Sequence, residues 1–192
     1  GHGDTIIAES CEYCNSFLSF APTVAVILNV EEDHLDFFKD IHDIQHSFRS
    51  FAQLVPEDRG WVVVNGDNDH AMEAVQDCGR ETLVFSRDGE RADCRAQNVT
   101  WERGLPRFDI LIHGEKYAHV ELRVGGEHNI SNALAAACAA WALGIPGSAV
   151  EEGLESFTGA GRRFEKKGEY QGAMVYDDSV SYTHLTLPTN SR

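Results

Sequence analysis

Basic residues are scarce in this sequence, and long apolar runs are absent. Lysine and arginine together number 16 against 31 aspartates and glutamates, which gives a net charge of −15 over 192 residues. Because proteins bind nucleic-acid backbones mainly by neutralising phosphates with lysine and arginine, this charge argues against a nucleic-acid partner. No apolar stretch approaches the roughly 20 residues that a membrane-spanning helix requires. We therefore expect no membrane partner and, by default, a cytoplasmic location.

A complete cysteine framework is also missing. The five cysteines form an odd set in which only Cys11 and Cys14 stand close together. An odd number favours reduced thiols over paired disulfides. Cys11-x-x-Cys14 has the spacing of half a zinc site or of a redox motif, but no second pair supplies the remaining ligands. The sequence thus favours small buried thiols over a metal or redox centre.

What the sequence does contain is an alternation of strand and helix patterns. Short, β-branched apolar runs are typical of strands buried on both faces of a parallel sheet, and they occur at 4–9, 23–30, 60–67 and 81–86. Residues 39–55 repeat isoleucine and phenylalanine at three- and four-residue steps, as an amphipathic helix does, and 69–78 form a shorter helix pattern. This order predicts an α/β fold with a mostly parallel sheet flanked by helices.

The pattern changes between residues 94 and 124. Polar and apolar residues alternate there without intervening helices, which predicts a smaller antiparallel strand portion. Two helices are expected after it, an alanine-rich one over 128–144 and another over 148–157. Ser148 is followed three residues later by Glu151, the spacing of a capping box, so Ser148 is expected to cap the second helix.

The first candidate site follows the apolar run 23–30, where the sequence reads NVEEDHLDFF. Ligands of open parallel sheets bind outside the carboxyl ends of the strands. If the run at 4–9 is a neighbouring strand, Glu9 and His34 lie at one sheet edge, where a carboxylate and an imidazole can share Mg²⁺ with phosphate oxygens and water. The alternative is that Asp33 and Asp36 cap the following helix and that His34 is merely solvated.

A second candidate site is the segment GGEHNISNALAA, residues 125–136. Two glycines lead into a helix whose first turn carries His128, Asn129 and Asn132. The free N–H groups of a helix start attract anions, and an asparagine amide both donates to and accepts from an adenine edge. The alternative is that Asn129 is simply the N-cap and that the alanines allow tight helix packing.

A third candidate is the glycine-rich turn FTGAGRRFE, residues 157–165. The guanidinium fork of Arg162 or Arg163 is suited to gripping phosphate oxygens. A solvated pair of arginines in a loop is the equally plain alternative.

The amino-acid sequences of these segments, and their order along the chain, resemble the motifs of the Mur ligases. AESCEYCNSFLSFAPTVAVILNVEEDHLDFF (8–38) is similar to the family's A-E-A-C-E-Y-x-x-S-F-L, followed by a strand and N-I-E-x-D-H-L-D. GEHNISNALAA is similar to G-x-H-N-x-x-N-A-L-A-A, and FTGAGRRFE to F-x-G-x-x-R-R-F. The resemblance runs from about residue 3 to Asp178 and so covers most of the chain.

The resemblance implies an ATP-dependent ligase of peptidoglycan synthesis that joins L-alanine to UDP-N-acetylmuramate through an acyl phosphate. Its small-molecule partners are then these two substrates and ATP, with ATP and Mg²⁺ as cofactors. No catalytic residue separate from the ATP and metal site is implied. The resemblance assigns nucleotide binding to His128, Asn129, Asn132, Arg163 and Asp178, and Mg²⁺ binding to Glu9 and His34.

Two departures from the family pattern predict a fragment. None of the four lysines follows a glycine, as the phosphate loop G-x-x-x-x-G-K-[ST] requires, and SVSYTHLTLPTNSR replaces the expected tyrosine and paired histidines after Asp178. We expect residues 1–163 to be the N-terminally truncated central ATP-binding domain, 164–178 to begin the C-terminal domain, and 179–192 to be a foreign or misassembled tail. Such a fragment is expected to be inactive alone.

Two alternatives to this function remain open on the sequence. One is another Mur-type ligase, such as the ligase that recycles muropeptides. The other is a non-catalytic nucleotide- or metal-binding module, which the missing phosphate loop favours.

Overall fold

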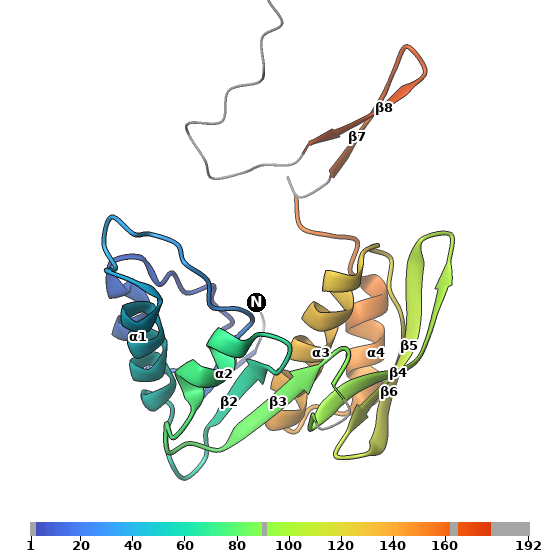
Figure 1. Cartoon of the computed structure of the whole chain (residues 1–192). Coiled ribbons are helices and arrows are strands. Elements are labelled where there is room, and N and C mark those ends of the chain that lie inside the picture. The colour runs from blue at the N-terminus through green and yellow to red at the C-terminus, as the bar shows by residue number, and fades with distance from the viewer. Residues whose placement is uncertain (1–2, 90–91, 162–164, 178–192) are drawn as a thin grey trace, which may run out of the picture.

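The protein is built on one six-stranded sheet, in the strand order β1-β2-β3-β4-β5-β6 (Figure 1). The computed structural model describes residues 3–89, 92–161 and 165–177. The first three pairings, from β1 to β4, are parallel, and the last two, from β4 to β6, are antiparallel. The strands are β1 (Val24–Ile27), β2 (Trp61–Asn65), β3 (Thr82–Ser86), β4 (Cys94–Glu102), β5 (Leu105–Ile112) and β6 (Glu115–Glu121). The predicted α/β fold, with an antiparallel portion, is confirmed.

Helices cover both faces of the parallel part. The side chains of β2 point alternately to the two faces: Val62 and Val64 pack into one apolar cluster, and Val63 packs into another. The first cluster contains side chains of α1 (Ile41–Gln53) and α2 (Asp69–Val75), and the second contains side chains of α3 (Glu127–Ala142) and α4 (Gly147–Ser156). All three valines are fully buried, as expected for a strand that is apolar on both faces.

Two smaller elements complete the chain. The 3₁₀ segment η1 (Tyr13–Ser19) stacks the ring of Phe17 on Phe51 of α1, with ring centroids 4.7 Å apart. Strands β7 (Glu165–Tyr170) and β8 (Ala173–Asp177) form a separate antiparallel hairpin, which stands apart from the six-stranded sheet in Figure 1.

The prediction of a strand at residues 4–9 is wrong. Residues 5–12 have no regular secondary structure, and Ile6 and Ile7 are 91% and 95% exposed. A strand requires hydrogen bonds from a neighbouring strand, and no strand in the described part of the chain pairs with this run. Its β-branched composition is therefore not sufficient to make it a strand here.

The expected capping box at Ser148 is also wrong. α4 begins at Gly147, with Pro146 as N-cap and no side-chain cap, so Ser148 lies inside the first turn. Glu151 has a different role, because its Oε1 accepts a hydrogen bond from the backbone N of His119 at 2.7 Å and so ties α4 to β6. The start of α4 is close to β6, since a Cβ at position 147 would lie 1.7 Å from the carbonyl oxygen of Tyr117.

The cysteines divide into two groups. Cys78, Cys94 and Cys138 are buried free thiols, as expected, whereas Cys11 and Cys14 are exposed and contradict that expectation. A hydrogen bond with Cys138, together with burial, raises the pKa of the Cys94 thiol well above its usual value. Among the described helices, none combines the length and the apolar character needed to cross a membrane.

Candidate functional site

The parallel strands β1, β2 and β3 end at one edge of the sheet, where hydrogen bonds connect the segments that follow them. The side chain of Asn68, after β2, accepts a hydrogen bond from the backbone N of Val30, after β1, at 3.3 Å. The carboxylate of Asp67 accepts from the backbone N of Arg87, after β3, at 2.7 Å and also from the hydroxyl of Ser86. The carboxyl ends of these strands are the usual ligand-binding edge of an open α/β sheet.

Helix α3 starts at the same edge. The guanidinium of Arg87 donates through Nη1 to Oε2 of Glu127, the first residue of α3, at 2.8 Å. It also donates to the carboxylate of Asp88 through Nη2 at 2.5 Å and Nε at 2.9 Å. The hydrogen bond from Arg87 lowers the pKa of Asp88. Residues far apart in the sequence are thus brought together beside the start of α3.

The first two turns of α3 carry the residues expected to bind the base. Its N-cap is Gly126, not Asn129, so the alternative role of Asn129 as N-cap does not hold. Asn129 donates from Nδ2 to the carbonyl oxygen of Gly125 at 2.7 Å, and Asn132 donates from Nδ2 to Oδ1 of Asn129 at 3.3 Å. His128 and Asn132 are exposed and accessible to a ligand, whereas Asn129 is half-buried and fixed.

Gly126 is required by the shape of this turn. Its φ of +97° lies in the region that favours glycine. A Cβ at this position would also lie 2.6 Å from Cε1 of His128. The second glycine of the sequence motif therefore permits the imidazole of His128 to pack against the backbone at the helix start.

His34 lies in the loop after β1, held by neighbours on several sides. Its Nε2 is 3.4 Å from Oε1 of Glu12, and its ring lies 4.7 Å from the ring of Tyr13. Its backbone N donates to Oδ1 of Asp33 at 2.7 Å. The hydroxyl of Tyr13 donates to Oδ2 of Asp36 at 2.9 Å, and this hydrogen bond raises the pKa of Tyr13. The imidazole is thus oriented and not merely solvated.

Glu9 is exposed in the irregular segment before η1, and it forms no ion pair within the described residues. The carboxylate next to His34 is that of Glu12, three residues further along. No group of three or more histidine, cysteine, aspartate or glutamate side chains in residues 3–89, 92–161 and 165–177 is arranged to hold a metal ion. The strand that would have brought Glu9 beside His34 is thus missing, and within the described residues no contact joins the two side chains. Two protein ligands would in general be enough for Mg²⁺, which usually keeps several waters and is bound by one or two protein carboxylates together with phosphate oxygens.

The alternative in which Asp33 and Asp36 cap the next helix does not hold. The N-cap of α1 is Asp40, whose side chain accepts a hydrogen bond from the backbone N of Asp43 at 3.0 Å. The acids between β1 and α1 are therefore not needed to start that helix.

A pocket of about 320 Å³ opens beside this loop. Its carboxylates are those of Glu12, Glu31, Glu32 and Asp33. Among the residues that the structure describes, no basic side chain lines it. The electrostatic field of such a pocket favours a cation over an anion.

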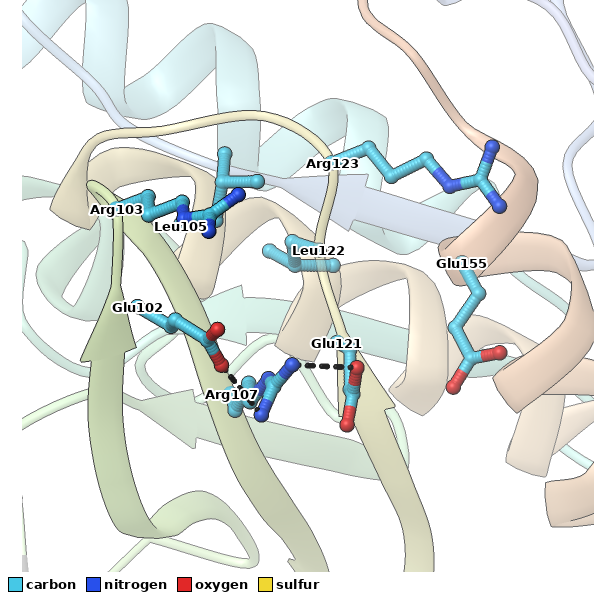
Figure 2. A pocket seen from close by; sticks show the side chains of 8 residues that line it. All are labelled: Glu102, Arg103, Leu105, Arg107, Glu121, Leu122, Arg123 and Glu155. Carbon is cyan, nitrogen blue, oxygen red and sulfur yellow. Dashed lines mark ion pairs between the residues drawn. The ribbon is translucent and has the colours of Figure 1, made fainter.

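A second pocket, of about 280 Å³, lies between the β4–β5 turn, the end of β6 and α4 (Figure 2). Three of its six charged side chains are paired with one another, because Arg107 contacts Glu102 at 2.7 Å and Glu121 at 3.2 Å. Of the residues expected to bind ATP or metal, those that the structure describes, namely Glu9, His34, His128, Asn129 and Asn132, do not line it. Gly104, in the β4–β5 turn, packs closely against Gly125, which leads into α3. A Cβ at Gly125 would lie 2.9 Å from the carbonyl oxygen of Gly104.

Arg163 and Asp178 lie outside the described residues. Sequence reasoning missed the residues that join the strand ends to α3: Asp67, Ser86, Arg87 and Glu127. A signal was present, because NGD (65–67) and SRD (86–88) follow apolar runs as the acids of the first candidate site do. The pairing of Arg87 with a residue forty positions later was not readable from spacing.

Comparison with known proteins identifies the family. Residues 6–140 match the Mur ligase middle domain. The UDP-N-acetylmuramate–L-alanine ligase of Clostridium novyi is 42% identical over 96% of this chain and 39% of its own length. That of Lachnospira eligens is 44% identical over the same shares. The chain thus spans about two fifths of the length of the curated relatives that it matches.

Solved structures share the fold. A crystal structure of MurF from Acinetobacter baumannii superposes with a TM-score of 0.72 at 25% identity, over 85% of this chain and 35% of that one. The UDP-N-acetylmuramate-alanine ligase MurC of Thermotoga maritima superposes with a TM-score of 0.70 at 22% identity, over 86% of this chain and 36% of that one. Motifs, sheet topology and the match over residues 6–140 agree, and the chain belongs to the Mur ligase family through its middle domain.

Proposed function

We propose that this chain is the nucleotide-binding part of an ATP-dependent ligase that joins L-alanine to UDP-N-acetylmuramate in peptidoglycan synthesis. The observation that carries the proposal is the alignment of 96% of the chain, at 42% and 44% identity, with two ligases of that name. The placement of the start of α3 beside the ligand-binding edge of the sheet supports it.

In the proposed reaction, ATP phosphorylates the lactyl carboxylate of UDP-N-acetylmuramate. The amino group of L-alanine then attacks the acyl phosphate, so that the amide forms and phosphate leaves. Phosphoryl transfer depends mainly on positioning and on neutralising charge. The chain's part in this chemistry is to hold the nucleotide and its metal ion in place.

The base is proposed to lie against the first two turns of α3. Asn132 is exposed there, and its amide offers both a donor and an acceptor to an adenine edge. Asn129 holds the turn through its bond to Gly125, and the ring of His128 packs next to it. For Arg163 on the phosphates and Asp178 on the ribose, the family resemblance is the only support.

Glu9 and His34 are proposed as the protein ligands of Mg²⁺. Bound there, the ion would neutralise charge on the nucleotide phosphates. Support comes from the donor types, from the contacts that Glu12 and Tyr13 make with His34, and from the carboxylate-lined pocket beside it. The contact of Glu12 with Nε2 and the neighbouring ring of Tyr13 orient the imidazole.

The domain boundaries are proposed as expected from the sequence, with 1–163 in the central domain and 164–178 at the start of the next. The separate β7–β8 hairpin supports a boundary before Glu165. The assignment of 179–192 as a foreign tail lies outside the described residues and stays a prediction. A cytoplasmic location without nucleic-acid or membrane partners fits the net charge of −15 and the small-molecule substrates.

The test is release of ADP and phosphate by the full-length protein given ATP, Mg²⁺, UDP-N-acetylmuramate and L-alanine. Omission of L-alanine should abolish sustained turnover. Turnover with a muropeptide in place of L-alanine would favour the recycling ligase, and nucleotide binding without turnover would favour the non-catalytic module.

The 192-residue chain is proposed to be inactive in the same assay. Its sequence contains no G-x-x-x-x-G-K-[ST], whose backbone N–H groups and lysine cradle nucleotide phosphates. Substrate-dependent ADP release above that of a heat-denatured control would contradict this part of the proposal.

A further inference from the structure

We infer that Arg87 is a positioning residue of the nucleotide site. Its ion pair with Glu127 fastens the first turn of α3 to the end of β3 and thereby sets where His128 and Asn132 point. This inference rests on the proposed function, because only that function gives the first turn of α3 a ligand.

The sheet side of this contact is firmly held. The backbone N of Arg87 donates to Oδ2 of Asp67 at 2.7 Å, and the hydroxyl of Ser86 donates to the other oxygen of the same carboxylate. The backbone N of Gly89 donates to the Ser86 hydroxyl at 2.5 Å. Ser86 is itself only 2% exposed. The turn that carries Arg87 is thus fixed from both of its ends.

The body of α3 is held by apolar packing, because Ile130 and Leu134 are buried in the core. Its direction as a whole is therefore set by the core and not by a single ion pair.

The first residues of α3 have fewer attachments. The N-cap is Gly126, which has no side chain with which to cap the helix. The side-chain bond from Asn129 to Gly125 stays within this segment, whereas the ion pair from Arg87 to Glu127 connects it to the end of β3. An acid at this position also interacts favourably with the helix dipole.

Arg87 is better placed to orient the helix than to bind phosphate itself. Its guanidinium donates through Nε and Nη2 to Asp88 and through Nη1 to Glu127, and its backbone N is bound to Asp67. Two carboxylates thus contact the guanidinium, and a third, that of Asp67, acts on it through its charge, which leaves no excess positive charge for an anion. The side chain of Arg87 is 30% exposed, whereas that of Glu127 is 68% exposed.

The consequence concerns affinity more than chemistry. A shift of the helix start moves Asn132 relative to the base, and displacements near 1 Å are enough to weaken a positioned contact. The reacting phosphate and carboxylate are held elsewhere, so the rate of the chemical step should change little. Loss of the ion pair is therefore expected to raise KM for ATP with little effect on kcat.

The experiment uses the full-length protein and four variants. Arg87→Gln and Glu127→Gln should each raise KM for ATP about two- to fivefold, the range that a partly exposed ion pair supports, with kcat within about twofold of wild type. The double variant Arg87→Gln with Glu127→Gln should raise KM no further than either single variant, because the same ion pair is lost in all three, and an additive increase would contradict the inference. Glu57→Gln is the matched control, because it removes an exposed glutamate paired with Arg80 at 3.0 Å and should leave KM unchanged.

Two kinetic outcomes would overturn the inference. Unchanged KM in both single variants would show that the ion pair does not position the site. A raised KM in Arg87→Gln but not in Glu127→Gln would show that Arg87 acts on the nucleotide directly.

A second readout separates this inference from the proposed function. If the wild-type protein showed no ATP-dependent turnover, the proposed function would fail. The effect of the Arg87–Glu127 ion pair on the stability of the start of α3 could still be measured. Amide hydrogen exchange at residues 128–132 should be faster in Arg87→Gln than in Glu57→Gln or wild type. Equal exchange rates in the three proteins would overturn the inference whatever the enzyme assay shows.

Discussion

The parallel and antiparallel parts of the sheet use their charged side chains differently. In the antiparallel part, charges pair with one another, as Asp109 does with Lys116 at 2.7 Å and with His119 at 2.8 Å. At the carboxyl edge of the parallel part Arg87 is also paired, but no basic side chain among the described residues lines the carboxylate-rich pocket beside His34, and the amide of Asn132 is exposed. Charges that are not paired within the protein are available to a ligand. This difference supports the proposal that ligands bind at the parallel edge.

Removal of His34 should have the largest effect. In the full-length protein, His34→Ala is expected to raise the Mg²⁺ concentration required for activity by at least the roughly 10- to 100-fold seen when residues that support a metal ligand are lost. The matched control is His46→Ala, because His46 is an exposed histidine on α1. An unchanged Mg²⁺ requirement in His34→Ala would contradict the proposal that Mg²⁺ binds at the parallel edge.

Loss of the Asn132 amide should have the next largest effect. Asn132→Ala is expected to weaken ATP binding by about 1–3 kcal/mol, because a polar edge of the bound base loses its partner. Asn132→Asp keeps the size and one acceptor but removes the donors, so it should also reduce the preference for ATP over GTP. Binding titrations with both nucleotides measure this, and an unaltered preference in both variants would return Asn132 to a structural role.

The antiparallel part should contribute a pH-dependent term to the stability of the fold and should not affect nucleotide binding. The hydrogen bond from Lys116, followed by those from Asn98 and His119, holds the pKa of Asp109 well below its usual range. The folded state therefore binds fewer protons than the unfolded state, so the contribution of Asp109 to stability is present above the unfolded pKa of about 3.9 and is lost as pH falls below it. In urea unfolding at several pH values, Asp109→Asn should lose less stability than wild type as the solution is acidified. Parallel acid curves for the two proteins would contradict this.

Arg107→Gln should have the smallest effect. Arg107 is 42% exposed and pairs with Glu102 and Glu121, which are exposed as well. Exposed pairs contribute about 0–1 kcal/mol, so the free energy of unfolding should fall by no more than that. KM for ATP should stay at the wild-type value. A raised KM would show that the pocket of Figure 2 takes part in nucleotide binding after all.

The order of strands and helices could be predicted from the sequence because it depends on local periodicity. The fully buried Val62, Val63 and Val64 and the amphipathic α1 are examples. The failures share a different cause. Ile6 and Ile7 have strand-like composition, but a strand also needs a partner, which composition does not reveal. The capping prediction for Ser148 failed because the packing of Gly147 on β6 places the helix start one residue earlier.

The candidate site was predictable in part for the same reason. The sequence showed that His34 follows a buried strand and that Asn132 lies near the start of a helix, so both could be proposed as site residues. Contacts between distant segments were not predictable, so the sequence did not reveal that Glu12 is the carboxylate next to His34 or that Arg87 meets Glu127. These partners are set by how the loops and α3 pack at the sheet edge.

The most direct test of the central claim is the crystal structure of the full-length protein with Mg²⁺ and a non-hydrolysable ATP analogue. The account predicts that the adenine lies against the first turn of α3, within hydrogen-bonding distance of the Asn132 amide, and that a metal ion contacts a ring nitrogen of His34. A nucleotide bound away from the carboxyl edge of β1, β2 and β3, with His34 and Asn132 both in solvent, would contradict it.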